Sequence, residues 1–246
     1  MANVLKVFAI HFVEGKAYPE ELIDCTVYPF MHRNIDFICA YFELFSTQAD
    51  FVGMYSLIIK CSVKICELKL ENFYDKIFNS ILQVFGANPQ QNLSLLNTLA
   101  NLIRYFEDSE VQKQWILNNL PGFLTSTLNL LSSQRDPDLI INWVDFVHNI
   151  YQLYNQHFLS LAEAEPVLEY ILVALAEAKE YNVNKKLTHF IALIFEDRNQ
   201  IYNPLLLKFL PKILEVILIK LLQWDGTAPV TSNSFLLPNT LFRLRI

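Results

Sequence analysis

The side chains that most often carry chemistry are sparse in this chain of 246 residues, and they form no familiar motif. The chain has no glycine-rich phosphate loop, no HExxH zinc motif and no nucleophile elbow. No two histidines stand four residues apart; the five are His11, His32, His148, His157 and His189. Because no nucleophile, base and orienting group occur together, we expect no catalytic, cofactor-binding or metal-binding residue and no enzyme activity.

The remaining candidates have structural interpretations. Cys61 and Cys66 stand five residues apart, so they project from different faces of a helix and cannot share a metal ion. We expect them, with Cys25 and Cys39, to be reduced and buried as small apolar residues. His148 is expected at the edge of a helical core. The paired carboxylates at 163 and 165 are expected to complement the positive end of a helix.

Composition narrows the classes of protein to which the chain can belong. Hydrophobic residues make up 53% and charged residues 18%, which excludes a disordered chain. The net charge is −6 and the basic residues are scattered, so we expect no direct nucleic-acid binding. Two apolar stretches, 77–103 and 209–224, are interrupted by amides or by charges, and a span of the bilayer needs roughly 20 predominantly apolar residues. We therefore expect no membrane insertion.

The apolar residues follow a helical spacing throughout, and alternation of the strand type is nearly absent. The clearest helix start is Asp136-Pro137, a capping residue followed by a proline that fits the first helical turn. Pro166 and Asn203-Pro204 predict two more starts, and Pro211 predicts a kink or a break. One helical face after residue 136 carries Leu139, Trp143, Phe146, Val147, Ile150 and Tyr154. Trp143 is expected in the core; Trp115 and Trp224 are placed near helix ends, where either a core or a partner could receive them.

The helical segments predict antiparallel pairs. The pairs are 31–45 with 51–68, 73–85 with 93–106, 123–131 with 139–154, 167–178 with 183–195, and 205–224 with the tail. First helices recur at steps of about 38 to 49 residues, close to the period of about 40–47 in two-helix HEAT or armadillo repeats. We predict an all-α solenoid over 1–246 with about five repeats, at 31–70, 71–108, 120–156, 164–198 and 203–246. A single packed helical bundle is the alternative.

The two ends of the chain carry apolar runs that have no polar cap, at residues 4–13 and 236–246. Terminal repeats of a solenoid normally need a polar outer face. The sequence therefore predicts a segment of a longer solenoid, or a gene model truncated at an internal methionine.

Residues 117–198 resemble the C-terminal HEAT repeats of the importin-β superfamily, and the transportin-3 and importin-13 branch is the most similar. The resemblance depends on hydrophobic pattern and on landmarks, which are Pro137-Asp138, Phe146, Phe158-Leu159, Leu168 and the 185–195 segment. A weaker likeness extends towards residue 31.

The resemblance implies a nuclear transport receptor that shuttles between cytoplasm and nucleus. Such a receptor binds protein cargo and the phenylalanine-glycine repeats of nucleoporins under control of the GTPase Ran. The main Ran site of the family lies on N-terminal repeats, which we do not expect in this segment, and the dispersed arginines leave the cargo class open. Partner-binding residues are unknown from the sequence. The alternative is a HEAT scaffold in another assembly, such as a vesicle coat, a kinase-regulatory complex or a nucleoporin-like subunit.

Overall fold

The regular structure of this chain is helical in every part that the computed structural model describes, namely residue 21 and residues 23–107, 109–132, 136–196 and 203–223. No strand occurs in those ranges, which confirms the all-α class. A π-helical turn, η1 (Ile23–Val27), and a 3-10 segment, η2 (Glu67–Phe73), accompany the α-helices. The α-helices are α3 (Tyr28–Leu44), α4 (Ala49–Cys66), α5 (Tyr74–Ala87), α6 (Ser94–Tyr105), α7 (Glu110–Ser132), α8 (Pro137–Ser160), α9 (Ala164–Glu177), α10 (Tyr181–Glu196) and α11 (Pro204–Gln223). The apolar runs 4–13 and 236–246, and Trp224, lie outside the described residues.

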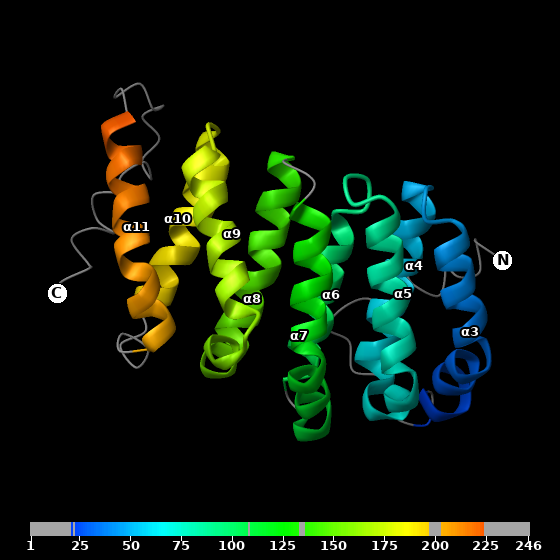
Figure 1. Ribbon diagram of the computed structural model, residues 1–246. Helices are drawn as coiled ribbons and strands as arrows, with labels where there is room; N and C mark the ends of the chain where they lie inside the picture. The colour runs from blue at the N-terminus through cyan, green and yellow to red at the C-terminus, as the bar shows by residue number, and fades with distance from the viewer. Residues whose placement is uncertain (1–20, 22, 108, 133–135, 197–202, 224–246) are drawn as a thin grey trace. The chain divides into compact units, whose positions relative to one another are not determined.

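The chain forms two compact units, residues 1–130 and residues 131–246. In the first unit α3 packs on α5 and α4 on α6, while α3 also contacts α4 and α5 contacts α6. In the second unit α8 packs on α10 and α9 on α11, and α9 contacts both α8 and α10. Alternate helices therefore lie side by side within each unit (Figure 1). The predicted repeat 120–156 includes residues of both units, and one continuous stack stays a prediction.

Helix α8 begins where the sequence indicated. The Asp136 side chain accepts hydrogen bonds from the backbone N–H groups of Asp138 and Leu139, at 2.9 and 3.1 Å. Pro137 occupies the first turn, where its missing N–H leaves no bond unmade. The predicted apolar face is buried, and its members Leu139, Trp143, Phe146, Val147, Ile150 and Tyr154 are each at most 4% exposed. Asn203 begins α11 in the same way, through a 3.0 Å bond from the Leu205 N–H.

Two prolines, Pro121 and Pro211, lie inside helices of the structure. Helix α7 begins at Glu110, not near residue 123, and contains Pro121; α11 runs without interruption through Pro211. A proline inside a helix removes one hydrogen bond, but buried residues on both sides hold the flanking turns in place. Those residues are Gln112, Ile116, Leu120 and Leu124 in α7, and Leu206, Phe209, Ile213 and Ile217 in α11. The sequence analysis expected a kink or a break at Pro211, and the helix does not break there.

A distortion occurs instead inside α8, at Tyr154. Its φ of −135° and ψ of 38° are not helical, and the helix continues beyond it to Ser160. The sequence analysis ended the helix at this residue, whereas the structure continues it to Ser160. Tyr154, at the distortion, and Phe158, in the turn that follows, are both buried.

Helix α4 ends at Cys66 because Glu67 adopts a φ of +43°, a conformation that side chains other than glycine seldom take. The Tyr74 hydroxyl donates a 2.8 Å hydrogen bond to the Glu67 carbonyl oxygen. In turn, the Gln112 side chain donates to that hydroxyl at 2.6 Å. Through these two hydrogen bonds, α5 and α7 support the strained turn at Glu67.

We expect Trp143→Ala to lower the free energy of unfolding by about 3–5 kcal/mol, because it empties a fully buried site. The Trp143 ring meets the ring of Tyr170 on α9 edge to face, with centroids 5.1 Å apart. Urea unfolding followed by far-ultraviolet circular dichroism measures the loss. An unchanged urea midpoint would contradict the placement of this face of α8 in the core.

We expect Asp136→Ala to cost about 1 kcal/mol, because two backbone N–H groups lose their acceptor. Asp136→Asn is the matched control, since asparagine keeps an acceptor oxygen and caps helices equally well. The same urea titration compares the two variants. Equal losses in both would mean that the charge of Asp136, and not its capping bonds, carries the effect.

Candidate interaction site

The cysteines lie where their chemistry is suppressed. Cys39, Cys61 and Cys66 are buried and are not joined in disulfides, whereas the Cys25 side chain lies outside the described residues. Burial raises the pKa of Cys39 and of Cys66 to about 11. Because the thiolate is the reactive form, these two thiols are unreactive near neutral pH and act as core residues.

Two histidines that are distant in the sequence come together between α8 and α10. The rings of His148 and His189 lie with centroids 5.5 Å apart, beside an ion pair between Lys186 and Asp145. The sequence analysis examined spacing within one helix and so missed this pair, whose members are brought together by packing of α8 on α10. Burial, assisted by His189 and Lys186, lowers the pKa of His148. No group of three potential metal ligands occurs among the described residues.

Trp115 lies within α7 and not at a helix end. Its ring is half-buried and contacts an aromatic cluster formed by Tyr74, Phe78, Phe106 and Phe123. The indole Nε1 donates a 3.1 Å hydrogen bond to the Asp75 side chain. Burial raises the pKa of Tyr74 to about 12, so its hydroxyl stays protonated and keeps its two hydrogen bonds. This cluster therefore holds α5 and α7 together within the first unit.

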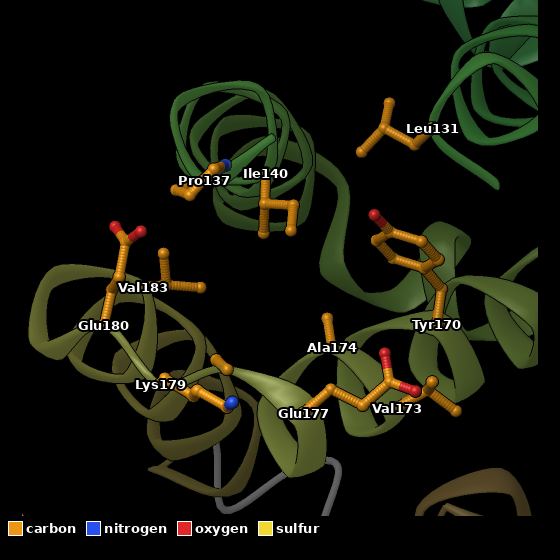
Figure 2. Close-up of a pocket in the computed structure, with 11 residues that line it drawn as sticks. Leu131, Pro137, Ile140, Tyr170, Val173, Ala174, Glu177, Lys179, Glu180 and Val183 are labelled. Carbon is orange, nitrogen blue, oxygen red and sulfur yellow. The ribbon is translucent and has the colours of Figure 1, made fainter. Parts of the chain in front are cut away.

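A concave feature with room for a ligand lies in the second unit, and Figure 2 shows it. Its volume is about 360 Å³, and it is bounded by the start of α8, the second half of α9 and the start of α10. The apolar lining comes from Leu131, Pro137, Ile140, Tyr170, Val173, Ala174, Ala178 and Val183. Glu177, Lys179 and Glu180 stand at its mouth, with Glu177 and Glu180 on opposite sides.

The side chains of this cavity suit binding more than chemistry. Its lining contains no histidine, cysteine, serine or threonine, and Tyr170 supplies the only hydroxyl group among the described lining residues. An apolar depression with a few charged groups at its mouth is the usual form of a site that receives part of another molecule. The sequence analysis named no residue here, because the turn at 177–180 becomes part of a cavity only when α9 and α10 pack beside the start of α8.

Helices that could cross a membrane are not found in the described part of the chain, since none is both long and apolar enough. Glu165, expected to complement the N-terminus of α9, lies in the first turn of that helix. It also forms an ion pair with Lys208 of α11, with 2.5 Å between Oε1 and Nζ.

We expect the free energy of unfolding to fall between about pH 7.5 and about pH 5.5, in part through His148. Its folded-state pKa lies below the ordinary value of about 6.5, so the unfolded chain binds a proton more readily. The contribution is complete above the unfolded pKa and is lost as the pH falls towards the folded pKa. Urea midpoints measured across this range should depend less on pH in His148→Phe than in the parent chain.

His32→Gln is the control for this measurement, because it removes a histidine from the other unit. An equal reduction of the pH dependence in both variants would show that the contact between His148 and His189 has no special part in it.

Comparison of the sequence with protein families and with curated proteins does not assign this chain to a family. No family model matches the sequence, and no curated protein matches it either. The resemblance of residues 117–198 to importin-β repeats therefore depends on the hydrophobic pattern and the landmarks alone.

Proposed function

We propose that this chain is a HEAT-type α-solenoid segment that works as a binding scaffold for other proteins. The observation that carries the proposal is a recurring, similar sequence separation between residues of packed helices. Hydrogen bonds between alternate helices join residues 38 to 43 positions apart in both units. The pairs are Ser56–Thr98, Asp36–Lys76, Tyr74–Gln112, Asp75–Trp115, Tyr151–Ile194 and Glu169–Lys212. This value agrees with the period of two-helix repeats, about 40–47 residues.

Ion pairs between stacked helices recur at the same separation. Lys208 and Lys212 of α11 contact Glu165 and Glu169 of α9, at 2.5 and 3.1 Å, so each partner residue lies 43 positions earlier. Lys76 pairs with Asp36 forty positions earlier, between α5 and α3. These pairs are exposed and contribute little stability each, but their recurrence supports a repeated unit.

We further propose that the scaffold is part of a nuclear transport receptor of the importin-β type. It would bind protein cargo and phenylalanine-glycine nucleoporins and shuttle between cytoplasm and nucleus, with the main Ran site outside this segment. The support is the resemblance of residues 117–198, together with the position of its landmarks in the structure. Pro137 begins α8, Phe146 and Phe158 are buried, and residues 185–195 lie within α10.

Binding to nucleoporin repeats tests the transport function. The whole chain is passed over immobilised peptides that carry phenylalanine-glycine repeats, and over matched peptides with serine in place of phenylalanine. We expect retention on the first peptide only. Equal behaviour on both peptides would reject a transport receptor.

The alternative scaffold is tested by purifying the whole chain, with its bound partners, from cells that express it. Capture of cargo that Ran-GTP releases supports the transport function. Co-purification of the chain in one fixed assembly, insensitive to Ran-GTP, supports a HEAT subunit of another complex.

A further inference from the structure

We propose that His148 on α8 and His189 on α10 together bind one divalent transition-metal ion of the Zn²⁺ type. The inference goes beyond the scaffold function proposed above and needs neither Ran nor nucleoporin repeats. Spacing within single helices predicts no metal site, but the packing of α8 on α10 brings these two imidazoles together. Four properties support a shared ion: the separation of the rings, their unused nitrogens, the balanced charges beside them and the rigidity of the two helices.

The distance between the rings fits two ligands of one ion. With Zn–N bonds of about 2.1 Å and a ring centre about 1 Å behind each nitrogen, two imidazoles on a tetrahedral zinc ion have centroids about 5 Å apart. The centroids of His148 and His189 are 5.5 Å apart, with 30° between the ring planes. Small rotations of the two side chains therefore suffice to bring one nitrogen of each ring to the ion.

The ring nitrogens are available for this role. In the described part of the chain neither ring makes a hydrogen bond, and the ring contacts of His148 are with His189 and Phe190. His148 is half-buried and His189 is exposed, so an ion can reach both rings from solvent. Water would complete the coordination, since no group of three potential ligands occurs among the described residues. We therefore expect weaker binding than at structural zinc sites, which have four protein ligands.

The charges beside the two rings cancel. Lys186 and Asp145 stand one turn before His189 and His148 on their helices and form an ion pair with each other. The ammonium group that would repel a cation is thus compensated by a carboxylate. An ordinary histidine has a pKa of about 6.5, so at about pH 7.5 most of each imidazole is in the neutral form that binds metals.

The helices hold the two histidines in place before any ion arrives. The Tyr151 hydroxyl on α8 donates a 3.4 Å hydrogen bond to the carbonyl oxygen of Ile194 on α10. The rings of Tyr151 and Phe190 meet edge to face, with centroids 6.0 Å apart, and both residues are buried. Because the backbone is already ordered, binding costs little conformational entropy. A bound ion would cross-link α8 to α10 and stabilise the folded chain by mass action.

Calorimetric titration of the whole untagged chain, freed of metals with a chelator, tests the site at about pH 7.5. The probes are zinc chloride and magnesium chloride. Imidazole suits zinc, whereas magnesium prefers oxygen ligands, so we expect zinc alone to bind. Equal binding of both ions would overturn the proposal, because carboxylates and not imidazoles would then hold the cation.

Variants locate the ion. Loss of even a supporting residue of a metal site costs about 10–100-fold in affinity, so His189→Gln and His148→Gln should each weaken zinc binding at least tenfold. His189 is exposed, so its replacement does not endanger folding. Lys186→Gln should strengthen binding, because it removes the nearby ammonium group. His32→Gln is the matched control, since it removes an exposed histidine from the other unit.

The cross-link itself has a separate readout. Zinc should raise the urea midpoint of the parent chain and of His32→Gln, and it should leave the midpoint of His189→Gln unchanged. Equal zinc affinity in the parent chain and in His189→Gln, or an equal rise of the midpoint in both, would reject the site between α8 and α10. These measurements involve no nucleoporin peptide, so their outcome and that of the transport test are independent.

Discussion

The packing of each helix on the next but one is the contact on which the other features of this chain depend. It buries one apolar stripe on α3 against α5 and another on α8 against α10. It places His148 beside His189 and forms the cavity next to the start of α8. Burial of these stripes supplies most of the stability, since the polar contacts between the helices are few and several are exposed.

The same packing explains why several side chains that could carry chemistry are unreactive. Cys39, Tyr74 and His148 lie in the layer between helices. The cost of desolvation there keeps Cys39 and Tyr74 protonated and favours the neutral form of His148. A shallow apolar depression, with Glu177, Lys179 and Glu180 among its lining residues, lies at the surface of the second unit. The scaffold function that we propose would depend on the shape and charge of such surfaces.

Much of the fold could be predicted from the sequence because helical spacing and capping are local signals. The start of α8 at Pro137 and the burial of Trp143 follow directly from residue types. The length of α7 could not be predicted in this way, because tertiary burial on both sides of Pro121 outweighs the local preference of proline. The φ of +43° at Glu67 is supported by a hydrogen bond from Tyr74, and no local sequence pattern predicts this conformation. The cavity and the histidine pair likewise join residues about 40 positions apart, so spacing within one helix could not reveal them.

The regular separation of the bonded residues has a consequence for the speed of folding. Among the described residues, bonded residues of alternate helices lie about 40 positions apart, so loops of similar and moderate length must close before each of these contacts forms. Contacts at moderate sequence separation favour faster folding than contacts between distant segments. During synthesis, α3 to α6 can pack on one another before α8 has left the ribosome, because their contacts lie within the first unit.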